Sequence, residues 1–244
     1  IAFGPVPSRR LGRSLGINNI PPKICTYSCA YCQLGRTDRM RAERQAFFDT
    51  DEVVEAVQKQ VESARAAGEA IDYLAFVPDG EPTLDLSLGS SIRALRSLEI
   101  PIAVITNGSL LDHGRVRDDL MEADWVSVKV DAVREESWRA IDRPQGTLSL
   151  GSILEGKRQF ARDFPGRLQT ETMLLEGVND GEEDLRKTAE FVGGLEPETA
   201  YVSVPTRPPA EPWARAPEES VLAAAYGVFT HRIPQVELLT GYEG

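Results

Sequence analysis

Hydrophobic positions along the chain follow two periods, one typical of strands and one typical of helices. Strand-like segments, which are short and largely apolar, fall at residues 14–18, 71–77, 101–106, 125–130, 168–175 and 200–204, with a further short candidate at 236–239. Helix-like segments, which repeat apolar positions every three or four residues, fall at residues 51–67, 92–98, 116–121, 153–164, 184–192 and 220–231. The helix at 51–67 has Thr50 as its expected N-cap and Gly68 as its expected stop.

The alternation of six strands with helices predicts parallel βαβ units. Because crossovers between parallel strands are right-handed, such units wind into a barrel or a doubly wound sheet. In both architectures, functional groups gather at the carboxyl ends of the strands. Polar motifs follow the predicted strands at residues 25–32, 80–81, 107–108, 131, 179–180 and 206–207. We therefore expect these motifs to meet at one edge of the sheet.

The charge of the chain is unevenly distributed. The 244 residues have a formal net charge of −11, but residues 1–45 carry +6 and the remainder carries −17. An acidic body argues against broad nucleic-acid binding, which depends on neutralising phosphates. The basic segment either pairs with the acidic body or forms a local mouth that attracts an anionic substrate.

The expected organisation is one core domain over residues 1–244, with a lead-in and first strand at 1–20 and a proline-rich loop and C-terminal helix at 205–244. The chain ends soon after a strand-like segment, which leaves open a further C-terminal domain outside it. No apolar run reaches the roughly 18 residues that a membrane span needs. No secretory leader is visible either, so we expect a cytoplasmic protein with no membrane partner.

All three cysteines fall within eight residues, at Cys25, Cys29 and Cys32, with the spacing C-x3-C-x2-C. Soft thiolates in a compact loop suit zinc, copper(I) or an iron–sulfur cluster. Structural zinc takes four protein ligands, but there is no fourth cysteine, and His113 and His231 lie far along the chain. A cubane held by three cysteines leaves one iron open to an exogenous ligand. The pattern favours a cluster over a structural metal or three reduced core thiols.

The cysteine spacing, with Tyr31 before the last cysteine, resembles the signature of the radical S-adenosylmethionine (radical SAM) superfamily. The segments 4–16 (GPVPSRRLGRSLG) and 80–83 (GEPT) resemble a wyosine-synthetase-like subgroup, most of whose members have no assigned substrate. The resemblance covers nearly the whole chain and implies a partial (β/α)6 TIM-like barrel of parallel strands with outer helices. It also implies a 4Fe-4S cluster that cleaves S-adenosylmethionine to a 5′-deoxyadenosyl radical. A low-potential electron donor such as flavodoxin or ferredoxin would reduce that cluster.

The resemblance implies two groups of cofactor contacts near the cysteines. Tyr31 is expected to lie against the adenine. The motif Asp79-Gly80-Glu81 resembles the family's Gly-Gly-Glu motif, with Asp79 in place of the first glycine, and is expected near the methionine amino group. Asn107 ends the strand at 101–106, where it either reaches the ribose or substrate or makes a turn with Gly108.

A further cofactor contact is expected on the strand at 125–130. Alternation places Ser127, Lys129 and Asp131 on one face of that strand. By resemblance to the activases of glycyl radical enzymes, Ser127 is expected on the ribose and Lys129 on the methionine carboxylate. The alternative is that Lys129 only forms a structural ion pair, with Asp131 or with Glu171.

The substrate side of the site is predicted from arginines that bracket the barrel at its first and sixth strands. Arg9, Arg10 and Arg207 form a candidate anion site, because the guanidinium fork suits phosphate or carboxylate. Asp131 is a further candidate substrate contact. The alternative is that Arg207 and the neighbouring prolines stiffen a closing loop and pair with acids.

Four functions remain open from the sequence. The first is a radical enzyme that abstracts hydrogen from a small or nucleotide-like molecule, and the second is an activase that places a radical on a partner protein. The third is wyosine-type modification of tRNA, which the acidic body argues against without excluding it. The fourth belongs to another class, a non-catalytic iron–sulfur protein for electron transfer or sensing, which would not need the motif at 79–81 or Lys129.

Overall fold

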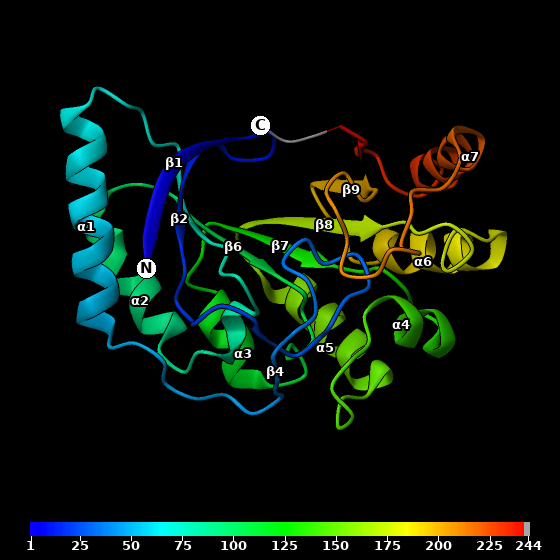
Figure 1. The fold of residues 1–244 in the computed structure, drawn as a ribbon, viewed down its shortest axis with the longest axis horizontal. Coiled ribbons are helices and arrows are strands. Elements are labelled where there is room, and N and C mark those ends of the chain that lie inside the picture. The colour runs from blue at the N-terminus through cyan, green and yellow to red at the C-terminus, as the bar shows by residue number, and fades with distance from the viewer. Residues whose placement is uncertain (242–244) are drawn as a thin grey trace.

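Most of the strands join into one curved sheet (Figure 1). The structure is a computed structural model that describes residues 1–241. The sheet has eight strands in the order β1-β2-β5-β6-β7-β8-β9-β10. Their bounds are β1 Ala2–Ser8, β2 Gly12–Ile17, β5 Tyr73–Phe76, β6 Ile102–Thr106, β7 Trp125–Lys129, β8 Arg167–Met173, β9 Thr199–Ser203 and β10 Val236–Leu239. From β2 onwards the neighbouring strands run parallel, whereas β1 runs antiparallel to β2.

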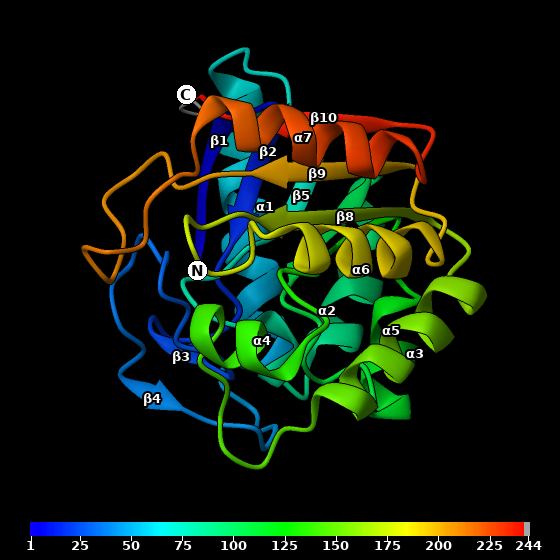
Figure 2. The same ribbon diagram turned by 90° about the vertical axis from the view of Figure 1, so that its right-hand side faces the viewer.

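Helices connect the parallel strands and lie outside the sheet (Figures 1 and 2). Their bounds are α1 Thr50–Ala66, α2 Leu88–Leu95, α3 Gly114–Leu120, α4 Glu135–Ile141, α5 Leu150–Asp163, α6 Glu182–Gly193 and α7 Glu219–Thr230, with short 3-10 turns at Pro82–Leu84 and Arg96–Leu98. The predicted fold class, a partial barrel of parallel strands with outer helices, is confirmed. Within residues 1–241, every helix is too short or too polar to cross a membrane.

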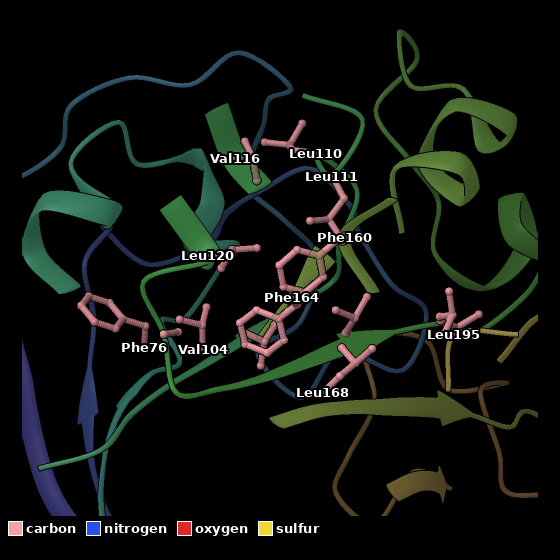
Figure 3. Close-up of a cluster of buried hydrophobic side chains, with 14 of the residues drawn as sticks. Phe76, Val104, Leu110, Leu111, Val116, Leu120, Phe160, Phe164, Leu168 and Leu195 are labelled. Carbon is pink, nitrogen blue, oxygen red and sulfur yellow. The ribbon is translucent and has the colours of Figure 1, made fainter. Parts of the chain in front are cut away.

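The outer face of the sheet packs against the helices and forms the main hydrophobic core (Figure 3). Alternation along each strand turns every second side chain towards this core, so Val126 and Val128 of β7 are buried there. Phe160 of α5 and Phe164, which caps the helix, contribute two rings that stack with centroids 4.8 Å apart. This packing holds the helices outside and leaves the inner face of the sheet for other groups.

The inner face of the sheet is apolar at one end and polar at the other. Near the amino ends of the strands, a separate buried cluster closes the barrel; its members are Leu11, Ala75, Ala103 and Trp125. Further along β7, the same face carries Ser127 and Lys129. The polar groups therefore gather towards the carboxyl ends of the strands, as parallel topology predicts.

Three features of the fold were not predicted. Strand β1 lies in the expected lead-in; Pro5 and Pro7 break its strand pattern, but an edge strand tolerates proline. Helix α4 was missed because it spans only two turns. A two-stranded sheet of β3 (Ile24–Cys25) and β4 (Arg39–Met40) was missed because its strands have two residues each.

One boundary was wrong and one was right. Helix α1 begins at Thr50, so its N-cap is Asp49 rather than Thr50. The short strand at 236–239 is present as β10, which pairs with β9.

Candidate active site

The cysteines lie in a loop that leaves β2 and crosses the carboxyl ends of the strands. Cys25 ends β3, and the backbone N–H of Cys32 donates to the carbonyl of Cys29 at 3.1 Å. Tyr27 anchors this loop to Trp138. The two rings pack edge-on with their centroids 6.1 Å apart, and the Tyr27 hydroxyl accepts a hydrogen bond from the indole N–H at 3.1 Å. Buried aromatic packing therefore holds one side of the loop.

All three cysteines are half-buried and line a cavity of about 380 Å³. That volume lies in the range of small-molecule sites. Most of the residues predicted from the sequence line this cavity: Cys25, Cys29, Cys32, Tyr31, Asp79, Gly80, Glu81, Asn107, Lys129, Arg10 and Arg207. Within residues 1–241, three predicted residues are not part of the cavity lining: Arg9, Ser127 and Asp131.

The Glu81 carboxylate joins the ends of β5 and β6. It is 1% exposed and accepts hydrogen bonds from the Thr83 hydroxyl at 2.5 Å and the Thr106 hydroxyl at 2.6 Å. It also accepts from the backbone N–H groups of Thr83 at 3.1 Å and Asn107 at 2.8 Å. Burial raises the pKa of Glu81, and these hydrogen bonds oppose that rise. With both oxygens engaged, the side chain fixes the position of Asn107.

Asn107 connects this strand end to the cysteine loop. Its side-chain amide donates to the Thr26 hydroxyl at 2.8 Å and lies 3.7 Å from the Cys25 sulfur. Burial, with the charge of Glu81 as the next cause, raises the pKa of Cys25 to about 12. A metal would hold such a thiol as thiolate, because coordination deprotonates it.

Gly80 allows the backbone to pass close to the cysteine loop. A Cβ built at Gly80 would overlap the carbonyl oxygen of Ile24, which directly precedes Cys25. Replacing Gly80 with alanine is therefore expected to displace the loop and to destabilise the fold by about 1–3 kcal/mol. Thermal denaturation measures this, with Gly146→Ala as control, because a Cβ at Gly146 meets nothing within 4 Å. Equal melting temperatures for the two variants would contradict the close approach.

Lys129 and Glu171 form the floor of the cavity. The Lys129 ammonium lies 3.0 Å from one oxygen of Glu171, and Arg10 lies 2.7 Å from the other. The Ser203 hydroxyl donates to Glu171 at 3.0 Å. The structural pair that was the alternative for Lys129 is thus present, and Lys129 also lines the cavity.

The charges on this floor stay fixed over a wide pH range. Burial on its own would raise the pKa of Glu171, but Lys129 and Arg10 outweigh it and lower that pKa to about 2. Burial on its own would lower the pKa of Lys129, but Glu171 and Asp131 outweigh it and raise that pKa. The Glu171 contribution to stability is therefore present at neutral pH and is lost as the pH falls from about 4.3 through about 2.

Ser127 and Asp131, which were predicted to contact cofactor or substrate, are both buried and are not part of the cavity lining within residues 1–241. Ser127 is fully buried one layer below Lys129, and its hydroxyl makes no hydrogen bond within residues 1–241. Alternation predicts the face of a strand but not the depth of a residue along the barrel, so Ser127 lies below the cavity lining and its ribose contact stays a prediction. Asp131 is 3% exposed and accepts from the Tyr31 hydroxyl at 2.5 Å and the backbone N–H of Met173 at 2.7 Å. It holds Tyr31 instead of facing a substrate.

Tyr31 and Cys29 are surrounded by buried charge. The Lys129 ammonium lies 4.7 Å from the centre of the Tyr31 ring. The Cys29 thiol lies 3.5 Å from a carboxyl oxygen of Asp142. Burial is the main cause that raises the pKa of Cys29, and burial together with Asp131 raises the pKa of Asp142. Sequence reasoning missed Asp142 because it ends α4, a helix that was itself not predicted.

Two of the three arginines of the candidate anion site line the cavity, and the third lies beside its lining. Arg10 and Arg207 line the cavity, and Arg207 donates to the Gln33 side chain at 2.7 Å. Arg9 is exposed and lies against Gly241. Arg9 and Arg10 lie in the turn after β1, and Gly241 itself lines the cavity, so a role for Arg9 in the anion site stays a prediction.

An ion triad centred on the buried Glu211 ties the proline-rich loop to the cysteine loop. Glu211 lies 2.8 Å from Arg36 and 2.5 Å from Arg143, and its backbone N–H donates to the carbonyl of Ala30 at 3.0 Å. Arg143 also donates to the carbonyl of Ser28 at 2.6 Å. Hydrogen bonds from the two arginines lower the pKa of Glu211 to about 2. Sequence reasoning missed this triad, because its members are far apart in the chain.

Replacing Glu211 with glutamine is expected to loosen the cysteine loop, since two guanidinium groups lose their shared anion. Iron bound to the reconstituted protein should then be lost to a chelator about tenfold faster, as expected for one charge-assisted hydrogen bond. Glu176→Gln is the control, because Glu176 is exposed and lies outside the triad. Equal rates of iron loss in the two variants would mean that the triad does not hold the loop.

Comparisons with known proteins agree with this geometry. The UPF0026 protein MJ1312 of Methanocaldococcus jannaschii is 46% identical over 246 residues, covering 100% of this chain and 76% of that protein. A radical SAM methyltransferase from Sphaerobacter thermophilus has a similar fold, with TM-score 0.71 and 19% identity over 93% of this chain and 66% of that one. The structure of TYW1 with a lysine–pyruvate adduct bound matches with TM-score 0.67 and 16% identity, over 91% of this chain and 74% of that one.

Family membership follows from the sequence match over most of the domain. The profile described as the Radical SAM superfamily matches residues 19–192, a stretch that includes the cysteine loop, Gly80, Glu81 and Lys129. This chain therefore belongs to the radical SAM superfamily of enzymes, which use a 4Fe-4S cluster and S-adenosylmethionine.

Proposed function

We propose that Cys25, Cys29 and Cys32 hold a 4Fe-4S cluster and that the cavity binds S-adenosylmethionine beside it. When bound, the reduced cluster supplies an electron that cleaves S-adenosylmethionine to methionine and a 5′-deoxyadenosyl radical, which abstracts hydrogen from a substrate. The observation that carries this proposal is that three cysteines from one loop line the same cavity as the strand-end residues Gly80, Asn107 and Lys129.

The donor set fits a cluster. Within residues 1–241, no three Cys, His, Asp or Glu side chains converge as ligands of a single metal ion do. A cubane does not need such convergence, because each cysteine binds a different iron. The sequence contains only these three cysteines, which leaves one iron for an exogenous ligand. The surroundings of Cys25 and Cys29 are partly apolar, and such a shell limits solvent access to a metal site.

The remaining lining supplies contacts for a molecule with an amino acid end and a nucleoside end. Lys129 presents a partly buried cation to a carboxylate. Gly80 brings backbone close to the cysteine loop, where its polar groups can meet an amino group. Asp131 holds the Tyr31 hydroxyl, which fixes the ring and the adjoining backbone for adenine. Glu81 acts through Asn107 and is therefore a positioning residue.

We assign the arginine-bearing part of the cavity lining to the substrate and call it the substrate side. Arg10 and Arg207 contribute guanidinium groups to this side, together with the apolar residue Leu239. This combination favours a substrate with an anionic group and an apolar part.

Binding of S-adenosylmethionine to the reduced cluster tests the proposal against a non-catalytic iron–sulfur protein. We expect the electron paramagnetic resonance spectrum of the dithionite-reduced, reconstituted protein to change when S-adenosylmethionine is added, because the added ligand takes the open iron. A spectrum that does not change, in a protein with a full cluster, would indicate an electron carrier or sensor instead.

A further inference from the structure

Strand β4 places exposed side chains directly beside a proposed cluster ligand. Cys25 pairs with Met40 across the small sheet, and the backbone N–H of Arg41 donates to the carbonyl of Cys25 at 3.0 Å. Both residues of β4 are exposed, and Met40 is 39% exposed although it is apolar. A single backbone hydrogen bond therefore connects Cys25 to a strand that is exposed on the outer surface of the molecule.

This surface has the opposite sign of charge to the rest of the molecule. Residues 23–41 carry four basic side chains and one acidic one, a net charge of +3, whereas the rest of the chain carries −14. Arg39 and Arg41 are exposed. Lys23 is half-exposed, forms an ion pair with the exposed Asp38 at 3.8 Å and lies where this surface meets the cavity lining. We name Lys23, Arg39, Met40 and Arg41 the β4 surface.

The position of the β4 surface suits access by another protein. β3 and β4 lie at the periphery of the molecule, apart from helices α6 and α7 (Figure 2). On the substrate side of the cavity, Arg207 lies in the loop after β9 and Leu239 ends β10. A protein on the β4 surface would approach Cys25 without passing through these segments.

We propose that the β4 surface docks an acidic one-electron carrier protein of the flavodoxin or ferredoxin type, which reduces the cluster by way of β3. This inference rests on the proposed function, because only a redox cluster needs such a donor. Complexes for electron transfer are small and short-lived, and charge complementarity sets their rate of association. A basic patch with one exposed apolar residue on an otherwise acidic protein matches that kind of partner, while the acidic remainder repels it elsewhere.

The test compares two reductants on the same reconstituted protein. Reduced acidic flavodoxin is mixed with the protein at low salt, and the loss of the visible absorbance of the cluster gives the rate; dithionite is the protein-free reductant. The variant is Arg39→Glu with Arg41→Glu. The matched control is Arg115→Glu with Arg232→Glu, which makes the same charge change at exposed sites on α3 and after α7. Arg39→Lys with Arg41→Lys keeps the charge.

We expect the Glu variant of the β4 surface to be reduced by flavodoxin at least about tenfold more slowly, as loss of electrostatic steering predicts. Its rate with dithionite and its iron content should not change. The lysine variant should keep most of the rate, and added salt should slow the wild-type protein more than the Glu variant.

Three results would overturn the docking proposal: an unchanged flavodoxin rate, an equal loss in the control pair, or an equal loss with dithionite. Failure of the proposed function is distinguishable, since it would show as a dithionite-reduced wild-type cluster that does not respond to S-adenosylmethionine.

Discussion

Replacing Cys29 with alanine is expected to abolish the cluster. The iron content should fall from about four atoms per chain in the reconstituted protein to a small fraction of that amount. Cys29 is one of only three cysteines in the chain, and it lies half-buried between Asp142 and the cavity, where no described histidine can replace it. Two thiolates do not hold a cubane, and the product 5′-deoxyadenosine should disappear with the iron. Iron analysis and the visible spectrum measure the first effect, and chromatography measures the second.

The control for this prediction is Gln33→Ala. Gln33 lies next to Cys32 and lines the same cavity, but has no sulfur. It should retain full iron content, and both variants should remain folded by circular dichroism, because neither side chain belongs to the main core. A Cys29→Ala protein that keeps its iron and its spectrum would contradict the ligand assignment.

Replacing Lys129 with methionine is expected to weaken binding of S-adenosylmethionine about 10- to 100-fold, the effect of losing one buried, charge-assisted hydrogen bond. The ammonium lies on the cavity floor, where a carboxylate of the ligand would share it with Glu171. Methionine keeps the length and the apolar stem of the side chain, so the change removes mainly the charge. Equilibrium dialysis against the cluster-loaded protein gives the dissociation constant.

The same variant also distinguishes a structural role for Lys129. Its loss leaves Glu171 with Arg10 and the Ser203 hydroxyl, so the melting temperature should fall in either case. If only the melting temperature falls and the dissociation constant stays the same, Lys129 is a structural partner of Glu171 and does not bind the ligand. Lys59→Met, on the exposed side of α1, should change neither quantity.

Local patterns in the sequence predicted the parts of the site that depend on neighbouring residues. The cysteine spacing located the loop, and alternation on β7 correctly placed Lys129 opposite Val126 and Val128. The positions after β5 and β6 placed Gly80 and Asn107 at the same edge as the cysteines, because parallel strands end together. These predictions required only periodicity and the direction of the strands.

The rest of the site depends on contacts between distant segments. The pair of Arg10 and Glu171 spans 161 residues, and the triad around Glu211 joins three loops. No local pattern encodes such partners, so Glu171 was foreseen only as an alternative partner of Lys129. The depth of Ser127 was not foreseen for a related reason, since the depth of a layer in a barrel depends on the stagger of all the strands.

Formation of 5′-deoxyadenosine tests the central claim most directly. The protein is reconstituted anaerobically with iron and sulfide, mixed with S-adenosylmethionine and dithionite, and analysed by chromatography. We predict 5′-deoxyadenosine in the wild-type reaction and none with Cys29→Ala. A wild-type protein that carries its full cluster but leaves S-adenosylmethionine intact would contradict the account.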